Sequence, residues 1–257
     1  MLFSIITATY QAAQTLPPTL QSIRQQTCQD FEHIIVDGAS TDGTLQIFHA
    51  YRQQCPAGHQ PVVSSEPDQG LYDALNKGIA RAQGEYLIFM NAGDTFHAND
   101  TLEQVSRLLE QQEKHPGVVY GETDIVDNDG NYLHPRRLRA PRKLSWKSFR
   151  NGMLVCHQSF YARRDLAPRY DLHYRFSADI DWCIRVMKAA EKRQLVLLNT
   201  GLILTNYREE GLTTKNHRAS LLERYRIMVK YYGRITTILM HLRFVFRNIK
   251  THPWPLP

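Results

Sequence analysis

Apolar segments of strand length alternate with segments of helical periodicity over the first 123 residues. The strand-like runs are short and rich in β-branched or aromatic residues, and they cover residues 2–8, 31–36, 61–65, 85–90 and 117–123. Between them, apolar residues recur at helical spacing around residues 16–23, 45–51, 71–82 and 101–114. This alternation predicts βαβ units and an α/β fold with a mainly parallel sheet.

The pattern weakens after Asp129. A strand is expected at residues 158–162, a helix at 177–190, and two short strands at 195–198 and 202–206. From His217 onward we expect two amphipathic helices, separated near Gly233. The simplest division is one domain over residues 1–215 and a helical C-terminal extension over residues 216–257.

Four polar loops follow the first four predicted strands. They are residues 7–10, 37–42, 66–73 and 91–94. Right-handed crossovers between parallel strands bring such loops to the same edge of the sheet, where the ligands of open α/β sheets bind. The sequence thus predicts one crevice, and its acids are Asp37, Asp42, Asp68, Asp73 and Asp94.

The crevice lacks the usual glycine-rich phosphate loops. The first loop reads Thr7-Ala8-Thr9-Tyr10-Gln11, without a Gly-x-Gly-x-x-Gly, and the chain contains no Gly-Lys-Ser/Thr. These absences argue against a dinucleotide-binding dehydrogenase and a P-loop nucleotidase. Acids at a nucleotide site can instead accept hydrogen bonds from base or ribose, or hold a divalent cation beside a diphosphate.

The net charge of +6 is unevenly distributed along the chain. Residues 216–257 contain eight Lys or Arg and one acid, a net +7, which leaves −1 for the rest. Apolar residues among these cations favour helices that lie on a membrane surface. The alternative is helices packed on the core or on a second subunit, as in a homodimer. A second basic run, residues 136–150, is either a solvated loop or a cover over an anionic ligand.

No uninterrupted apolar stretch reaches the roughly 18 residues that a membrane-spanning helix needs, and the start of the chain lacks the basic flank of a signal peptide. We therefore expect a cytoplasmic protein that is peripheral on the inner face of the bacterial membrane. The cysteines show no Cys-x-x-Cys spacing, which favours free thiols over a zinc site or disulfides. They are Cys28, Cys55, Cys156 and Cys183.

Four ordered segments resemble glycosyltransferase family 2. They are Thr9-Tyr10, Asp37-Gly-Ala-Ser-Thr-Asp42-Gly-Thr44, Ser65-Glu-Pro-Asp68-Gln-Gly70-Leu-Tyr-Asp73-Ala-Leu-Asn76-Lys77-Gly78 and Met90-Asn91-Ala-Gly-Asp94. The likeness is nearest to bacterial transferases of colanic-acid and capsule type. It implies a GT-A fold with a Rossmann-like nucleotide-binding half. It also implies inverting transfer from a nucleotide-sugar donor, with UDP favoured and GDP possible, to a hydroxyl of a glycan or lipid-linked acceptor in surface polysaccharide biosynthesis.

The resemblance also implies residue roles. Tyr10 and Asp37 match positions that contact the base, and Asp68 matches one that approaches the nucleoside. Asn76 and Lys77 match positions that face the diphosphate or the donor sugar. The donor-binding residues implied in this way are Thr9, Tyr10, Asp37, Asp68, Asn76, Lys77, Asn91 and Arg208.

The family's metal motif, Asp-x-Asp, reads Asn91-Ala92-Gly93-Asp94 in this chain. The resemblance implies that Asp94 holds a divalent cation, Mn²⁺ or Mg²⁺. The alternative for Asp94 is a cap before the next helix. Arg208 lies where the family closes a segment over the diphosphate, and its planar guanidinium suits a bidentate oxyanion contact.

The family's general base is an acid that opens a helix, and Asp179 in Ala178-Asp-Ile-Asp-Trp182 matches it. The alternative for Asp179 is compensation of the helix dipole. Residues two apart on a helix point about 200° from each other, so Asp181 cannot also face the crevice and is the structural partner. His157 and Gln158 resemble a pair that borders the acceptor side, to which Asp181 is also assigned.

Three classes of function are compatible with these residues. The four segments and Asp179 favour a glycosyltransferase. A catalytically inactive nucleotide-sugar-binding protein would explain the incomplete metal motif. A nucleic-acid-binding protein is suggested by the basic charge alone. An acidic crevice would repel the phosphate backbone of a nucleic acid, so no nucleic-acid partner is expected. Because all candidate residues precede residue 216, the C-terminal extension is expected to be dispensable for transfer.

Overall fold

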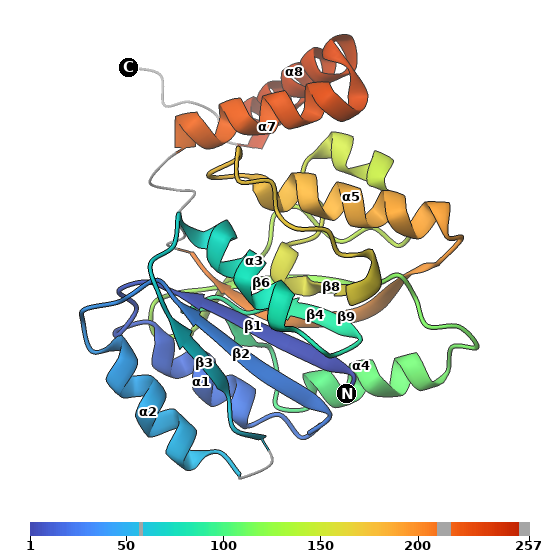
Figure 1. Ribbon diagram of the computed structural model, residues 1–257. Helices are drawn as coiled ribbons and strands as arrows, with labels where there is room; N and C mark the ends of the chain where they lie inside the picture. The colour runs from blue at the N-terminus through green and yellow to red at the C-terminus, as the bar shows by residue number, and fades with distance from the viewer. Residues whose placement is uncertain (57–58, 210–216, 252–257) are drawn as a thin grey trace.

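The first half of the chain alternates strands and helices, as the sequence pattern predicts (Figure 1). Its elements are β1 (Phe3–Thr9), α1 (Leu16–Arg24), β2 (Phe31–Asp37), α2 (Thr44–Gln54), β3 (Val62–Ser65), α3 (Leu71–Arg81) and β4 (Tyr86–Phe89). This computed structural model describes residues 1–56, 59–209 and 217–251, and in the last range the side chains of residues 218–242.

The second half is more irregular. Its elements are β5 (Thr95–Phe96), α4 (Thr101–Glu110), β6 (Val118–Val126), β7 (Tyr132–Pro135), β8 (Phe160–Arg163), α5 (Ala178–Lys192), β9 (Leu197–Arg208), α7 (His217–Tyr232) and α8 (Arg234–Thr251). Three short 3₁₀ helices are interspersed: η2 (Trp146–Asn151), η3 (His157–Ser159) and η4 (Arg164–Leu166). The four cysteines are free thiols, and Cys156 and Cys183 are buried.

One nine-stranded sheet runs through the molecule in the order β3-β2-β1-β4-β8-β6-β9-β5, with β7 paired to β6. Strands β3, β2, β1 and β4 are parallel, whereas β8 is antiparallel to both of its neighbours. Thr9 lies opposite Asp37, and Asp37 lies opposite Ser65. The carboxyl ends of β1, β2 and β3 are therefore level, which confirms the common edge expected from the sequence.

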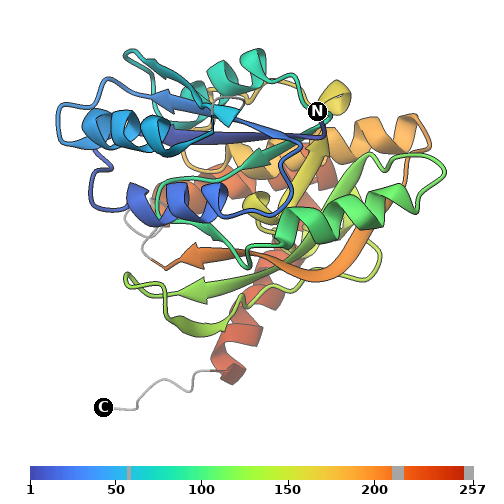
Figure 2. The ribbon, with the colours of Figure 1, turned by 90° about the horizontal axis from the view of Figure 1, so that it is seen from below.

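Helices cover both faces of the sheet (Figure 2). On one face α1, α2 and α4 bury residues such as Ile23, Phe48 and Leu102. On the other face α3 and α5 share a larger core with the inner side of β1 and β4, to which Leu75 and Ile184 belong. The loops that follow the carboxyl ends of β1, β2 and β3 lie side by side at one edge of this sheet.

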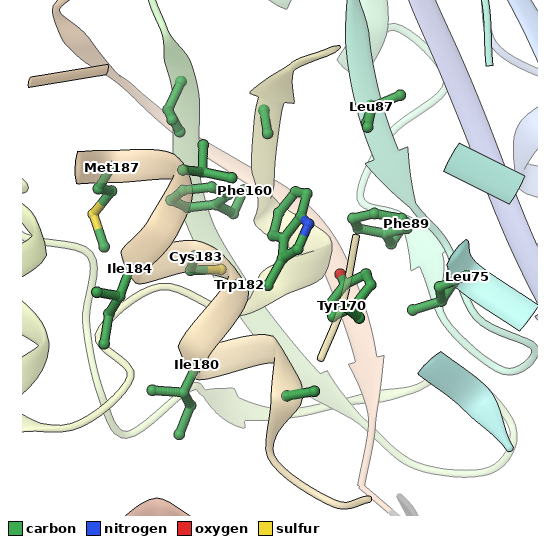
Figure 3. Close-up of a cluster of buried hydrophobic side chains, with 14 of the residues drawn as sticks. Leu75, Leu87, Phe89, Phe160, Tyr170, Ile180, Trp182, Cys183, Ile184 and Met187 are labelled. Atoms are coloured by element: carbon green, nitrogen blue, oxygen red, sulfur yellow. The ribbon is translucent and has the colours of Figure 1, made fainter. Parts of the chain in front are cut away.

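Trp182 anchors α5 to the sheet. Its ring stacks on Tyr170 at 5.1 Å and meets Phe89 of β4 edge-on at 5.2 Å, as Figure 3 shows. Its indole nitrogen donates to the carbonyl of Pro168 over 2.7 Å. Burial of so large an aromatic group with its polar atom satisfied is strongly stabilising. The first turn of α5 is thereby fixed over the end of β4.

The prediction of two short strands at 195–198 and 202–206 was wrong, because they form the single strand β9. The strand stays hydrogen-bonded to β6 through a register irregularity near Gly121 and Gly201. Gly201 has a φ of +70°, which glycine adopts without strain. A Cβ on Gly121 would lie 2.5 Å from the carbonyl oxygen of Leu202. These two glycines allow β9 to continue as one bent strand.

The two expected C-terminal helices are present and are separated at Gly233, whose φ is +80°. Helix α7 packs on α5 and η2, where Ile227 and Met228 are buried and Tyr232 stacks on Trp146. Of the alternatives considered for the extension, a membrane surface, the core or a second subunit, α7 therefore adopts the second and packs on the core. Within the described ranges, no helix combines the length and the apolarity needed to cross a membrane.

Candidate functional site

Asp37 forms the fixed centre of the first half of the site. Its carboxylate is fully buried and accepts hydrogen bonds from the hydroxyls of Thr9, Ser40 and Ser65 at 3.0, 2.6 and 2.7 Å. The backbone N–H of Ser40 donates a fourth at 2.9 Å. These partners come from β1, β3 and the loop after β2. They hold the carboxylate immobile at the common edge of three strands.

Three loops meet over Gly38. A Cβ at this position would lie 2.5 Å from a carboxylate oxygen of Asp68 and 3.4 Å from the ring of Tyr10. Asp68 is fixed by the backbone N–H of Gly70, which donates to it over 2.8 Å. The Tyr10 side chain is 67% exposed, so a ring face is open to a flat ligand. The structure therefore brings Thr9, Tyr10, Asp37 and Asp68 together.

Asn76 and Lys77 have other contacts. The Asn76 side chain is buried and exchanges hydrogen bonds with the backbone of Tyr170, at 3.1 and 2.6 Å. Lys77 donates to the carbonyl of Pro67 at 2.8 Å and lies within 3.7 Å of the carboxylates of Glu66 and Asp73. Asn76 thus ties α3 to the segment before α5, and Lys77 braces the loop after β3.

Asp94 lies in the turn after β4, where the sequence motif placed it. Its buried carboxylate accepts hydrogen bonds from the side-chain amide of Gln158 at 2.7 Å and from the backbone N–H of Arg208 at 3.2 Å. Burial raises the pKa of Asp94 to about 7, against the opposing effects of Gln158 and Arg208. A carboxylate in this position would be strongly stabilised by a cation.

Arg208 covers the same turn. Its Nε atom would lie 3.1 Å from a Cβ on Gly93, whose φ is +104°. The guanidinium therefore lies directly against the turn that carries Asp94. Gln158 contacts Asp94 rather than open space, so the structure assigns it a role in orienting that carboxylate.

The turn after β4 suits a divalent cation. The side-chain oxygen of Asn91 is buried and has no hydrogen-bond partner among the described residues. With Asp94 it provides two hard oxygen ligands, the type that Mg²⁺ and Mn²⁺ prefer. No group of three or more His, Cys, Asp or Glu side chains converges in the described part of the chain. A cation here would therefore need the diphosphate and water as its remaining ligands.

Asp179 and Asp181 point to different sides of α5, as helix geometry requires. Asp179 is half-buried, and the hydroxyl of Tyr72 lies 3.4 Å from its Oδ1. Asp181 is fully buried and accepts hydrogen bonds from Arg185, Lys230 and Tyr231 at 2.6, 2.9 and 2.8 Å. Asp181 therefore joins α5 to α7, away from the crevice.

Asp94 and Asp179 border one interior region. The negative charges of both raise the pKa of Cys156 and of Tyr207, in addition to the larger effect of burial. His157 packs on the ring of Phe89 at 5.5 Å. Burial lowers the pKa of His157 although Asp179 opposes the shift, so its imidazole is neutral. Its Nε2 has no partner within the described ranges.

The basic run at residues 136–150 divides into two groups. The guanidinium of Arg136 donates to the carbonyls of Leu138, Met153 and Leu154, and that of Arg139 pairs with Glu122 at 3.2 Å. These two arginines therefore hold the loop in place. The exposed cations of the run are Arg137, Arg139, Arg142, Lys143, Lys147 and Arg150.

The sequence reasoning overlooked Tyr72, Tyr207 and Glu223. Tyr72 is inside the quoted motif, and Tyr207 directly precedes Arg208, so both were within reach of a motif argument. Glu223 is the one acid of residues 216–257. Its position as a single acid among basic residues could have drawn attention to Glu223, although no spacing rule connects Glu223 to α5.

Comparison with known proteins identifies the class. The family model described as glycosyl transferase family 2 matches residues 4–169. A PGL/p-HBAD biosynthesis glycosyltransferase of Mycobacterium bovis is 34% identical over 213 residues, covering 82% of this chain and 78% of that protein. A putative teichuronic acid biosynthesis glycosyltransferase of Bacillus subtilis is 30% identical over 156 residues, or 60% of each chain.

Solved structures share the fold. Staphylococcus aureus TarS 1-349 in complex with UDP-GlcNAc has a TM-score of 0.68 at 18% identity, covering 97% of this chain and 73% of that one. The mannosyltransferase PcManGT of Pyrobaculum calidifontis, in complex with GDP-Man and Mn²⁺, has a TM-score of 0.60 at 18% identity, covering 93% and 70%. The fold is the GT-A fold, as the sequence predicted. The chain belongs to glycosyl transferase family 2 and is a glycosyltransferase of the inverting class.

Proposed function

We propose that the protein transfers a sugar from a nucleotide-sugar donor, with UDP favoured over GDP, to a hydroxyl of a glycan or lipid-linked acceptor in the assembly of a cell-surface polysaccharide. The observation that carries this proposal is the pairing of Asp94 and Asp179. The two carboxylates border the same interior from opposite elements, and the charge of each reaches Cys156 and Tyr207. One suits a cation at the leaving group, and the other suits a base at the acceptor.

The donor nucleotide would occupy the edge formed by β1, β2 and β3. The exposed ring of Tyr10 would stack on the base, and Asp68 would accept a hydrogen bond from base or ribose. Asp37 already accepts four hydrogen bonds, so its main effect would be to fix this edge and add negative charge behind the base. UDP is favoured because TarS, whose structure holds UDP-GlcNAc, shares the fold over more of this chain, and with a higher TM-score, than the enzyme that holds GDP-Man.

A divalent cation would be held by Asp94, with the side-chain oxygen of Asn91 as a second ligand. When bound, it would offset the charge that develops on the departing diphosphate. Arg208 lies against the same turn and would bind the diphosphate oxygens through its guanidinium. Gln158 would keep the Asp94 carboxylate oriented, as outer-shell partners of metal ligands do.

Transfer would proceed by a single displacement. Asp179 accepts the proton of the acceptor hydroxyl while the hydroxyl oxygen attacks the anomeric carbon. The bond from that carbon to the diphosphate oxygen breaks, its electron pair leaves with the nucleoside diphosphate, and the configuration inverts. His157, neutral and with an unpartnered Nε2 among the described atoms, would hydrogen-bond the acceptor or the donor sugar in this interior.

A membrane-bound acceptor would suit the C-terminal helices. Helix α8 leaves the apolar side chains of Ile235, Ile238, Leu239 and Leu242 exposed, at 48–78%. Positions i, i+3, i+4 and i+7 share one helix face, and Arg234 beside them is exposed. We propose that this face lies on the anionic inner surface of the membrane, which makes the protein cytoplasmic and peripheral. The mycobacterial and Bacillus relatives are named for biosynthesis of PGL/p-HBAD and teichuronic acid.

The test is a screen of UDP, GDP and their common sugars against the full chain, with and without Mn²⁺. Thermal shift identifies the donor, and NMR of the product formed with a soluble glycoside or phenol acceptor reports the anomeric configuration. We expect a Mn²⁺-dependent shift with one nucleotide and an inverted product. Binding of a nucleotide sugar without turnover of any acceptor would instead support a catalytically inactive binding protein.

A further inference from the structure

The backbone that leads into α5 is held by α7. The carboxylate of Glu223 accepts hydrogen bonds from three consecutive N–H groups, those of Arg175, Phe176 and Ser177, at 2.9, 2.8 and 3.0 Å. The hydroxyls of Ser177 and Ser220 are also 3.0 Å apart. These contacts immediately precede the first turn of α5, in which Asp179 lies. A carboxylate on N–H groups ahead of a helix satisfies donors that would otherwise lack partners.

Tyr72 approaches the same carboxylate from α3. Its hydroxyl is 3.4 Å from Asp179 Oδ1, and its buried ring packs on Tyr170 at 5.2 Å. Burial raises the pKa of Tyr72 well above its usual value, and the charges of Asp179 and Glu223 raise it further. The phenol therefore stays protonated and can donate to the Asp179 carboxylate, whose Oδ1 also accepts a hydrogen bond from the backbone N–H of Ile180 at 2.9 Å.

Asp179 is surrounded by groups that do not ionise near neutral pH. Its charge reaches Tyr72, Cys156, His157, Tyr170, Cys183 and Tyr207. Burial raises the pKa of each tyrosine and cysteine and lowers that of the histidine, so all six are neutral. The other charged groups that act on these six residues are Asp94, Glu223, Arg136 and Arg185. Of these six neutral groups, Tyr72 is the one whose hydroxyl is recorded within hydrogen-bond distance of the Asp179 carboxylate.

We propose that Tyr72 and Glu223 are positioning residues for Asp179, and that α7 is for this reason a working part of the transfer site. The proposal rests on the proposed role of Asp179 as the general base. Glu223 fixes the backbone from which Asp179 projects, and Tyr72 fixes the direction of its carboxylate. A displacement of about 1 Å at a reacting group costs on the order of 10²-fold in rate. Catalytic hydrogen bonds are often long before substrate binds and shorten afterwards. The 3.4 Å between the Tyr72 hydroxyl and Asp179 Oδ1 is consistent with this behaviour.

This assignment changes the expectation for the C-terminal extension. Loss of residues 216–257 would remove Glu223, two of the three partners of Asp181 and one buried residue of the main core, Ile227. Transfer would then fail even with a soluble acceptor. Removal of α8 alone would leave all of these contacts in place.

The experiment compares Tyr72→Phe and Glu223→Ala in the full chain, with kcat, the donor KM and the pH profile of kcat as readouts. Each variant should lose roughly tenfold in kcat, the worth of one hydrogen bond to a charged group, with an unchanged donor KM. Tyr72→Phe should also move the acid limb of the profile to higher pH, because a donor to the ionised carboxylate is lost. Glu223→Gln retains one acceptor oxygen and should recover part of the rate.

The matched control is Glu191→Ala. Glu191 lies at the other end of α5 and accepts a hydrogen bond from the Trp146 indole at 2.9 Å, so it tests for general loosening of the helix. It should keep its kcat and pH profile. In an Asp179→Asn background, Tyr72→Phe should cause no further loss, since the group that it positions is gone.

The outcomes separate the two proposals. If Asp179→Asn transfers at the normal rate, the base is misassigned and the proposed mechanism fails. If Asp179→Asn is inactive while Tyr72→Phe and Glu223→Ala keep both kcat and the pH profile, the positioning role is overturned. Calorimetric donor binding identifies any variant that has lost its fold, and Tyr72→Phe, which removes one oxygen atom, then decides the question by itself.

Discussion

The two halves of the site are built differently. In the nucleotide half, Asp37 is satisfied by Thr9 and Ser65, each 28 residues away on a neighbouring strand, and by Ser40 in its own loop. In the transfer half, Asp94 is bonded to residues 64 and 114 positions away, and Asp179 lies against Tyr72 at a separation of 107. The first half is a local property of adjacent strands, whereas the second depends on distant segments.

The central carboxylate of the nucleotide half and two polar atoms of the transfer half also differ in how completely they are paired. Asp37 accepts four hydrogen bonds within the protein. In the transfer half, Asn91 Oδ1 and His157 Nε2 are buried without partners among the described residues. An unpaired buried polar atom is costly unless a ligand satisfies it. The nucleotide edge is therefore preformed around Asp37, whereas under the proposed function the transfer half would be completed by the cation, the donor and the acceptor.

Asp179→Asn should distinguish the two halves most clearly, because it should affect the rate of transfer and not the affinity for the donor. The amide keeps the shape of the side chain but cannot take up the acceptor proton, so transfer should fall by roughly 10²–10⁴-fold. Donor affinity, measured by calorimetry, should not change because the nucleotide edge is untouched. Asp181→Asn is the control, and it should lower thermal stability with a much smaller effect on transfer. If only Asp181→Asn abolished transfer, the roles of the two acids would be reversed.

Gln158→Leu tests whether Asp94 depends on a distant segment for its orientation. The substitution removes the amide that donates to Asp94 at 2.7 Å. Outer-shell changes of this kind cost about 10–100-fold in metal affinity, so we expect Mn²⁺-linked nucleotide binding to weaken by that factor. Nucleotide binding without Mn²⁺ should stay the same. An equal loss under both conditions would mean that Gln158 acts on the nucleotide and not through the cation.

The exposed apolar face of α8 should affect membrane binding and leave nucleotide binding and sugar transfer unchanged. Ile238→Glu combined with Leu239→Glu should weaken binding to anionic vesicles by about tenfold or more, because burial of one such side chain is worth 1.5–3 kcal/mol. Transfer to a soluble acceptor should be unaffected. Val196→Glu, at an exposed apolar position of 57% exposure far from α8 in sequence, is the control. If the double variant changed the oligomeric state in gel filtration instead of vesicle binding, the face would be a homodimer contact.

The buried histidine of the nucleotide half should make the stability of the folded protein decrease at acid pH. His33 of β2 is fully buried between Thr7 and Tyr51, and burial lowers its pKa from 6.5 to about 3. The unfolded chain therefore binds a proton that the folded protein excludes, so stability is complete above pH 6.5 and declines as the pH falls toward 3. The decline is at most about 1.4 kcal/mol per pH unit. His33→Gln should flatten it in urea unfolding, whereas the exposed His49→Gln should not.

The sequence was sufficient for the nucleotide half. The alternation of strands and helices, and the polar loops after β1 to β4, follow from periodicity and crossover handedness, and they place Asp37 and Asp68 at one edge. Helix geometry also separated Asp179 from Asp181. The contacts of Asn76 with Tyr170 and of Glu223 with α5 were not accessible in this way. They join segments that no local rule relates, and only tertiary packing brings them together.

Calorimetric titration of the donor nucleotide into the wild-type chain and into Asp94→Asn, each with and without Mn²⁺, tests the central claim most directly. Our account predicts that Mn²⁺ strongly increases affinity in the wild type and has no effect on the variant, whose fold and metal-free binding are preserved. Equal Mn²⁺ dependence in the two proteins would contradict it, because the cation would then be held elsewhere than in the turn after β4.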